Sequence, residues 1–170
     1  MTMSDCDNKC DCCKLPTIQF SNKSDNPDPI YAKAGDSGFD LRAFITVEEG
    51  GEERKITLQP FERRLIHTGL YFELYRGVEM QVRPRSGNAI KCGLTVINTP
   101  GTVDSQYRGE VCVLLINLSL QDQEIENGDR TAQAVICPVC CEGSYALTKV
   151  EDISTETERG ADGFNSTGIK

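Results

Sequence analysis

The sequence lacks long hydrophobic runs and has few basic residues. No apolar stretch in its 170 residues approaches the ~20 residues that a membrane-spanning helix requires, so no membrane partner is predicted. The 18 Lys and Arg residues are outnumbered by 26 Asp and Glu residues, which gives a formal net charge of −8. Because binding along a nucleic acid requires clustered cations, direct nucleic-acid binding is not expected. An anionic ligand therefore has to be held by a few local cations.

A secretory signal is also missing. The segment Met1–Cys6 contains an acidic residue and neither a basic region nor an apolar stretch. The reducing cytoplasm is therefore the expected location. The nine cysteines cannot all pair, and thiols in that compartment are usually free or metal-bound. No disulfide framework is predicted.

Length and composition indicate one folded domain between two tails. A chain of 170 residues has the usual size of one domain and buries about 70% of its unfolded surface. Residues 1–14 are rich in cysteine, so we expect a Cys-rich, mobile amino-terminal tail there. Residues 15–157 form the predicted domain. Residues 158–170 are rich in glycine and have no strong strand pattern, which favours a flexible arm.

Two-residue alternation of apolar and polar side chains predicts strands. Phe39, Leu41 and Ala43 alternate with polar residues, as expected for a strand with one buried face. Residues 78–82 repeat the pattern, and Leu15–Phe20 is a further short candidate. The runs 111–116 and 132–139 are apolar at both odd and even positions, which predicts strands covered on both sides.

Turn-forming clusters separate these strands, at residues 35–38, 50–51, 100–101 and 127–129. Many short strands with regular turns indicate an all-β fold, either a β-sandwich or a distorted jelly roll. The fold class predicted here is therefore all-β with one short helix.

The predicted helix lies around Asn88–Lys91, with Ser86 as its N-cap and Gly93 as its left-handed stop. Its amino end would present Arg85, the Ser86 hydroxyl and backbone N–H groups together. Such an arrangement suits a phosphate.

Single motifs are ambiguous. The segment Pro84–Gly87 is more often a capped turn than a phosphate site, and Gly128–Arg130 is more often a hairpin turn with a solvated arginine. Asp104 lies in a turn-forming stretch, where an aspartate usually bonds its own backbone. A carboxylate that activates water is the less common case there.

The order of the motifs along the chain is more specific than any one of them. Five segments strongly resemble the five motifs of the trimeric deoxyuridine triphosphatases (dUTPases), namely Ala34–Ala43, Arg83–Gly87, Gly101–Gly109, Gly128–Gln133 and Arg159–Gly168. The resemblance spans about residues 30–170. It implies hydrolysis of dUTP to dUMP and pyrophosphate with Mg²⁺, which keeps uracil out of DNA and supplies dUMP for thymidylate synthesis. It also implies a homotrimeric jelly roll with its active sites between subunits.

The resemblance assigns the catalytic role to Asp104, which matches the family's water-activating carboxylate. Attack on a phosphoryl centre requires an oriented water, a base and cations that neutralise the developing charge. With no nucleophilic side chain involved, water attacks the α-phosphorus directly and no covalent intermediate forms.

The same resemblance implies the substrate contacts. The phosphates are expected at Arg85, Ser86, Gly87 and Gln133, and under a lid formed by the carboxy-terminal arm. The arm's matching residues are Arg159, Phe164, Asn165, Ser166 and Thr167, with Phe164 as the aromatic that stacks on uracil.

Selectivity is expected from the hairpin that follows Asn98. Main-chain groups around Asn98, Thr102 and Val103 match those that pair with the uracil edge, and an unpaired buried group would reject cytosine by roughly 10⁴-fold or more. Tyr107 matches the residue that packs under the deoxyribose and excludes a 2′-hydroxyl.

Mg²⁺ is expected on the triphosphate and not in an all-protein cage, because it is a hard cation that keeps several waters. Asp40 resembles the acid of the first motif. It either supports the metal's waters or orients an arginine, and a plain ion pair with Arg42 is the alternative.

The sequence departs from the family pattern at several positions. Asn88 replaces a usual Leu, Gln106 a frequent Asp and His67 a common Pro; a lone histidine is more often structural than a ligand. Asp162 and Asn165 each replace a Gly in the arm, and the charge of Asp162 is expected to weaken closure of the arm.

The cysteines lie outside the resemblance. Cys6, Cys10, Cys12 and Cys13 have irregular spacing and no nearby histidine, so free thiols are favoured over a zinc site. The pair Cys137 and Cys140 has the spacing Cys-x-x-Cys within an apolar strand, where buried thiols are favoured over a redox pair.

Two other functions are open. dCTP deamination shares the fold and the Arg-Ser motif, but the stretch Asp104–Tyr107 follows the triphosphatase pattern. Regulation of a partner protein through the tail or arm is a possible second role, suggested by the extra residues at the amino end.

Overall fold

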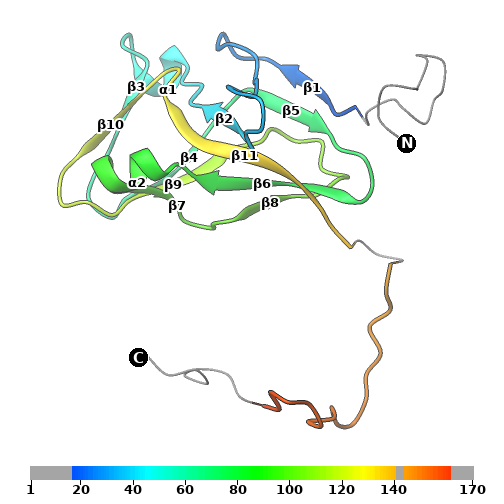
Figure 1. Cartoon of the computed structure of the whole chain (residues 1–170). Helices are drawn as coiled ribbons and strands as arrows, with labels where there is room; N and C mark the ends of the chain where they lie inside the picture. The colour runs from blue at the N-terminus through cyan, green and yellow to red at the C-terminus, as the bar shows by residue number, and fades with distance from the viewer. Residues whose placement is uncertain (1–16, 141–143, 162–170) are drawn as a thin grey trace, which may run out of the picture.

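The computed structural model describes residues 17–140 and 144–161. Within these ranges the chain forms an all-β fold with two short helices (Figure 1). The strands and helices are, in order, β1 (Gln19–Asn22), β2 (Phe39–Arg42), α1 (Val47–Gly50), β3 (Lys55–Leu58), β4 (Arg63–Ile66), β5 (Leu70–Glu73), β6 (Val78–Pro84), α2 (Ser86–Cys92), β7 (Leu94–Val96), β8 (Gly101–Val103), β9 (Val113–Asn117), β10 (Gln123–Glu126) and β11 (Arg130–Pro138).

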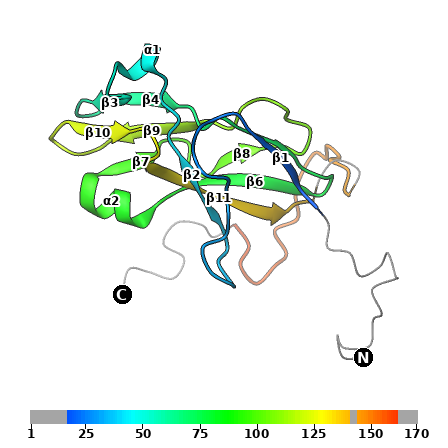
Figure 2. The same ribbon diagram turned by 90° about the horizontal axis from the view of Figure 1, so that it is seen from above.

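The strands pair into antiparallel sheets. The largest sheet has the order β2-β11-β6-β8, a second has the order β4-β9-β7, and β1 with β5 and β3 with β10 form two-stranded ribbons. The four-stranded and three-stranded sheets lie on either side of the core, and α2 lies beside β7 at the end of the molecule where β6 ends (Figures 1 and 2). This arrangement is the β-sandwich that the sequence predicts.

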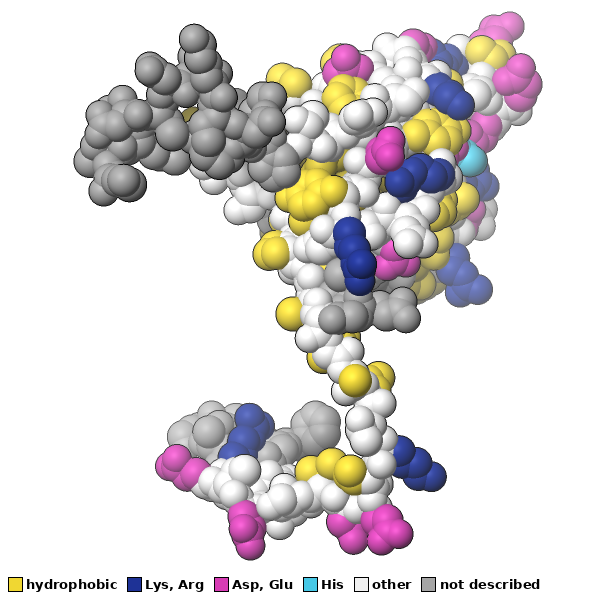
Figure 3. Space-filling view, turned by 90° about the vertical axis from the view of Figure 1, so that its right-hand side faces the viewer, with side chains coloured by type: hydrophobic (Ala, Val, Ile, Leu, Met, Phe, Trp, Pro, Cys, Tyr) yellow, Lys and Arg dark blue, Asp and Glu magenta, His cyan; other side chains and the backbone are white. Residues whose placement is uncertain are grey.

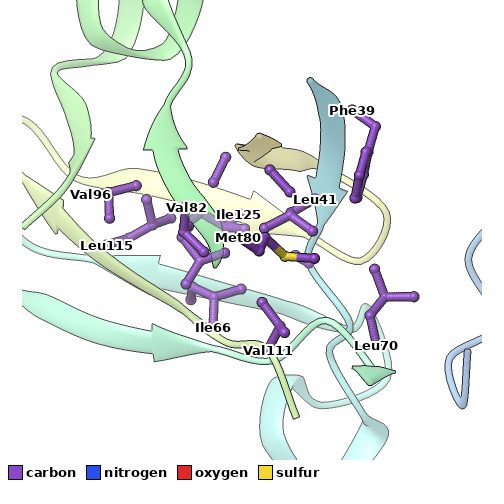
Figure 4. Close-up of a cluster of buried hydrophobic side chains, with 14 of the residues drawn as sticks. Phe39, Leu41, Ile66, Leu70, Met80, Val82, Val96, Val111, Leu115 and Ile125 are labelled. Carbon is purple, nitrogen blue, oxygen red and sulfur yellow. The ribbon is translucent and has the colours of Figure 1, made fainter. Parts of the chain in front are cut away.

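The core is built from the alternating residues of both sheets. Leu41 and Met80 from the first sheet and Leu115 from the second are at most 1% exposed, and Figure 4 shows their side chains in one cluster. Alternate residues point to opposite faces of a strand, so the neighbours of these side chains remain half-exposed. The interior positions are therefore those that the alternation predicts.

Two strand predictions differ from the structure. The run 111–116 is a strand only from Val113, and only one face of it is buried, because Leu114 and Ile116 are half-exposed in the single chain. The amino-terminal candidate is shifted to β1 at Gln19–Asn22, since it pairs there with β5. Residues 15 and 16 lie outside the described part.

The helix prediction is right in place and wrong in its cap. Gly93 ends α2 in the left-handed conformation, at φ 66°. Ser86 is the first helical residue and not the N-cap; Arg85 occupies that position, extended and without a side-chain capping bond. Arg85 continues the extended backbone of β6, and its side chain binds Asp40.

A second short helix, α1, was not predicted. Thr46 caps it by accepting a hydrogen bond from the Glu49 backbone N–H. Four residues are too few to show a helical period, so the sequence reading found only the turn at Gly50 and Gly51.

The chain leaves the sandwich after β11. Residues 144–161 are exposed and contain only turns and bends, and Figure 1 shows them running away from the sheets. The predicted tail at 1–14 lies outside the described residues, as does the arm beyond residue 161. In the described part, no helix has the length and apolar character of a membrane span.

Candidate active site

The first group of predicted site residues lies where three strands of the largest sheet meet. Gln133 on β11 stands opposite Asp40 on β2 and opposite Arg83 on β6. Antiparallel pairing therefore places the first, second and fourth motifs side by side. Gln133 donates a hydrogen bond from Nε2 to the carbonyl oxygen of Pro84 at 2.9 Å.

Asp40 holds two guanidinium groups in this group. Its Oδ1 accepts a hydrogen bond from Arg85 Nε at 2.8 Å, and its Oδ2 lies 3.3 Å from Arg130 Nη1. Arg42, the alternative partner, donates instead to the carbonyl oxygen of Gly128 at 2.8 Å. Asp40 therefore fixes two cations at the edge of the sheet, which matches the arginine-orienting alternative.

The residues that follow Arg85 place α2 over this edge. Ser86 is exposed and Gly87 half-buried at its first turn. Asn88 donates from Nδ2 to the carbonyl oxygen of Arg130 at 2.8 Å. Asn88 thus attaches α2 to β11 through a hydrogen bond, where the usual Leu would pack by apolar contact.

The second group lies on β8 and the turn after it. Thr102 and Asp104 are exposed, Val103 is half-buried, and Asn98 stands over Gly101, where a Cβ atom would lie 3.1 Å from Asn98 Nδ2. Asp104 lines an open cavity with Glu79, Arg76, Arg108, Tyr145 and neighbouring residues. Its carboxylate is accessible to water.

Tyr107 is held by the turn that follows Asp104. Its backbone N–H donates to the carbonyl oxygen of Asp104 at 3.0 Å, and its hydroxyl donates to the carbonyl oxygen of Glu110 at 2.9 Å. A Cβ atom at Gly109 would lie 2.4 Å from the Tyr107 hydroxyl oxygen. Gly109 therefore leaves the space in which the tyrosine ring lies.

Glu110 anchors the end of this turn. Its Oε1 accepts backbone N–H groups from Thr68 at 3.0 Å and Gly69 at 2.7 Å. Burial acts to raise the pKa of Glu110, but the hydrogen bond from His67 and those from the two backbone groups outweigh it, so the pKa is lowered. Glu110 is thus a charged anchor for the segment that carries Tyr107.

The two groups are far apart within one chain. In the β6–β8 pair, Val103 stands opposite Met80, which places Asp104 near the start of β6, whereas Arg85 follows its end. About six residues of strand at ~3.3 Å each separate the two positions, or roughly 20 Å. One chain therefore does not bring Asp104 and Arg85 together.

The third group belongs to the carboxy-terminal arm. Arg159 lies in its described part, exposed and before the left-handed Gly160. Phe164, Asn165, Ser166 and Thr167 lie outside the described residues, and so does Asp162.

Sequence reading missed three contributors to these groups. Arg130 binds Asp40, Glu110 anchors the turn, and Gly109 makes room for Tyr107. Arg130 and Gly109 each lie inside one of the five motifs, and that position was the available sign that they contribute. Only the strand register shows that Arg130 pairs with the carboxylate of Asp40, 90 residues away.

Comparisons with known proteins give a consistent result. A family model described as dUTPase matches residues 24–168. The deoxyuridine 5'-triphosphate nucleotidohydrolase of Treponema denticola is 55% identical over 141 residues, which cover 83% of this chain and 90% of that protein. The protein of the same name from Caulobacter vibrioides is 49% identical over 151 residues, covering 89% and 92%.

Solved structures share the fold. A mutant dUTPase of Staphylococcus bacteriophage 80alpha, solved with dUpNHpp, has a TM-score of 0.77 at 23% identity and covers 91% of this chain and 100% of its own. A mutant dUTPase from phage phi11 of S. aureus, described with a structural Mg(II) ion, has a TM-score of 0.69 at 21% identity, with coverage of 81% and 99%.

Proposed function

The chain belongs to the dUTPase family and is a hydrolase acting on dUTP, and from this premise we propose that it cleaves dUTP to dUMP and pyrophosphate. Asp104 accepts a proton from a water molecule as the oxygen of that water attacks the α-phosphorus. The bond from the α-phosphorus to the bridging oxygen breaks, and pyrophosphate leaves with that oxygen. The exposed position of Asp104 in an open cavity supports this role.

We propose that each active site is assembled from different copies of the chain in a homotrimer. A base and a phosphate-binding group must both reach the α-phosphate, and a triphosphate is much shorter than the roughly 20 Å that separates Asp104 from Arg85 along β6. The two groups can act on one substrate only when Asp104 of one copy faces Arg85 and Ser86 of another. The separation between Asp104 and Arg85 is the observation that supports a site shared between copies.

The cluster around Asp40 supports binding of the triphosphate. Arg85 and Arg130 are held in place by Asp40, so little side-chain entropy is lost when they contact phosphate. Gly87 leaves open space beside the backbone, since a Cβ atom there would meet nothing within 4 Å. In this proposal Ser86, Gly87 and Gln133 complete the phosphate site.

The donor set of this cluster fits Mg²⁺ carried by the substrate. Both oxygens of Asp40 already contact guanidinium groups, so Asp40 would reach the ion through water and not as a direct ligand. When bound to the phosphates, Mg²⁺ neutralises part of the charge that develops on the leaving pyrophosphate. The residues of this chain orient the phosphates and activate the water.

Selectivity is proposed to come from the second group. The Tyr107 ring lies in the space that Gly109 leaves and packs under the deoxyribose, which leaves no space for a 2′-hydroxyl. Backbone groups around Asn98, Thr102 and Val103 pair with uracil. Arg159, Phe164, Asn165, Ser166 and Thr167 close over the bound nucleotide.

The proposed role in the cell follows from this reaction. Removing dUTP limits uracil in DNA, and dUMP is the precursor for thymidylate synthesis. The odd number of cysteines supports a reducing compartment, the cytoplasm.

The role of Asp104 is tested by the Asp104→Asn variant. We expect kcat for pyrophosphate release from dUTP to fall about 10²–10⁴-fold, because the water loses its general base. Asp122→Asn, which removes an exposed carboxylate outside the site, is the matched control and retains full activity. Wild-type kcat in Asp104→Asn would remove the residue from this role.

The position of attack is tested separately with water labelled with oxygen-18. Attack on the α-phosphorus places the label in dUMP, as measured by mass spectrometry. Label found in pyrophosphate would show attack on the neighbouring phosphorus and would contradict the proposed mechanism.

A further inference from the structure

Three side chains with different ligand atoms form a cluster that includes none of the proposed catalytic groups. His67 follows β4, and Glu110 and Cys112 precede β9. One ligand atom from each residue lies within 4.8 Å of the other two. His67 Nδ1 lies 2.9 Å from Glu110 Oε2 and 3.7 Å from Cys112 Sγ.

The backbone orients the carboxylate of this cluster. Glu110 Oε1 accepts the N–H groups of Thr68 and Gly69, and Oε2 is the oxygen that contacts His67. Hydrogen bonds of this kind fix the orientation of a metal ligand and are a regular part of metal sites. The cluster therefore has one ligand whose geometry is set before any ion binds.

The two separations measured from His67 Nδ1 are close to those of a tetrahedral zinc site, and the third separation is at most 4.8 Å. Zinc bonds to histidine nitrogen, carboxylate oxygen and cysteine sulfur are about 2.0–2.3 Å long, so neighbouring ligand atoms lie roughly 3.3–3.6 Å apart. The observed separations of 2.9 and 3.7 Å require shifts of only a few tenths of an ångström. A nitrogen, an oxygen and a sulfur ligand together suit Zn²⁺ better than Mg²⁺ or Ca²⁺.

We propose that His67, Glu110 and Cys112 form a zinc site, distinct from the Mg²⁺ that accompanies the substrate. The fourth position is filled by water or by Glu49, which lines a cavity beside His67 and Glu110. The thiol of Cys112 releases its proton to the solvent when the metal binds.

An ion can reach the cluster from solvent. The His67 side chain is 44% exposed, and Figure 3 shows the single histidine of the described chain, in cyan, at the molecular surface. Cys112 is half-buried, and burial, followed by the charges of Glu110 and Glu49, raises the pKa of its thiol to about 11. The two carboxylates that disfavour a free thiolate would attract a cation to the same place.

The site would join two parts of the fold. His67 lies in the connection between β4 and β5, and Glu110 ends the turn that carries Tyr107, whose hydroxyl binds the Glu110 carbonyl oxygen. A metal here would cross-link these segments and stabilise the folded chain, because it binds the folded state and not the unfolded one.

Cobalt(II) is the spectroscopic probe for this site. The parent protein is the full chain with Cys6, Cys10, Cys12 and Cys13 replaced by serine, so that these thiols do not contribute. We expect one equivalent of Co²⁺ per chain to give a thiolate-to-cobalt absorption band in the parent. Cys112→Ser should lose that equivalent, whereas Cys92→Ser, which removes another half-buried free thiol, should keep it.

His67→Gln is a second variant that should still fold, because the exposed His67 side chain contributes little to the core. We expect it to lose the same equivalent with an unchanged circular dichroism spectrum. Zinc at 100 times its Kd shifts the unfolding equilibrium of the parent about 100-fold and should leave His67→Gln unshifted. Equal cobalt binding by the parent, Cys112→Ser and His67→Gln would overturn the proposal, as would loss of the band in Cys92→Ser.

Discussion

Gly109 shows how a single missing side chain can set the position of a neighbouring one, the Tyr107 ring. The Cβ of an alanine at this position would lie 2.4 Å from the Tyr107 hydroxyl oxygen and 2.6 Å from the ring carbon that bears it. Both contacts are too short, and the atoms involved are at the free end of the tyrosine. The ring would therefore move while the backbone stayed in place.

Gly109→Ala should impair recognition of the sugar more than stability. We expect kcat/KM for dUTP to fall about 10²-fold, since displacement by about 1 Å can cost that much, and the preference for dUTP over UTP to shrink. Steady-state kinetics with both nucleotides measure this change.

Tyr107→Phe is the matched control for this substitution. It keeps the ring and removes only the hydroxyl bond to Glu110, which contributes about 1 kcal/mol of stability. Its preference for dUTP should therefore survive. An unchanged preference in Gly109→Ala would contradict the role given to the Tyr107 ring.

At this scale the motif order names candidate site residues but does not show how they are held. The sequence left three roles for Asp40, namely supporting the metal's waters, orienting an arginine and pairing with Arg42. The choice depends on strand register, which brings Arg130 beside it from 90 positions away. The partners of His67 were missed for the same reason: Glu110 lies 43 residues from it, and no local pattern joins them.

At the scale of elements, three connections meet around Asp25. This residue lies between β1 and β2. Its carboxylate binds Arg54, which precedes β3. It also accepts a hydrogen bond at 3.3 Å from Asn127, which follows β10. Hydrogen bonds from Arg54, and then from Asn127, lower the pKa of Asp25 from 3.8 to about 2. The three loops are therefore joined through one ionised group.

The stability from this contact should depend on pH in a defined window. Because the pKa is depressed in the folded chain, the stabilisation is fully present above the unfolded pKa of about 4 and is lost as the pH falls through about 2. We expect Asp25→Asn to melt below the wild type at pH 6, with the difference in Tm vanishing towards pH 2.

Thermal unfolding from pH 6 to pH 2 measures this window. Asp122→Asn corrects for the general effect of removing one negative charge from an acidic chain. A difference in Tm between Asp25→Asn and the wild type that stayed constant down to pH 2 would show that the ionised carboxylate contributes nothing.

Elements with a repeating pattern were predictable, and those set by pairing or capping were not. β2 and β6 follow from alternation over several residues. α1 has only four residues and depends on one capping contact at Thr46, so its sequence carries no period. β9 was predicted to be covered on both faces, whereas only one face is buried in a single chain.

At the scale of the whole molecule, the distance between Asp104 and Arg85 is the main observation. Each belongs to a well-formed group, yet the β6–β8 register places them at opposite ends of one strand pair. Motif order predicts which residues take part in a site but not which copy supplies each of them. The topology of the folded chain is required for that distinction.

Mixing experiments test whether copies share a site. Asp104→Asn lacks the proposed base, and Arg85→Ala lacks a proposed phosphate contact, so each variant alone should be nearly inactive. When the two are unfolded together and refolded as a mixture, some sites should contain Asp104 from one copy and Arg85 from another. We expect dUTP hydrolysis well above the sum of the two separate preparations.

Sedimentation velocity on the wild type should give the mass of three chains. The control for the mixing is each variant refolded alone by the same procedure. Activity in the mixture that never exceeded the sum of the two would indicate that each site is built within one chain.

The exposed segment after β11 bears on the role proposed for the carboxy-terminal arm. Twenty-one positions separate Pro138 from Arg159, and a chain of that length can extend to about 70 Å. If Arg159 acts at a neighbouring site as proposed, its local concentration there depends on the length of this exposed connection, and doubling that length would cost only about 0.6 kcal/mol.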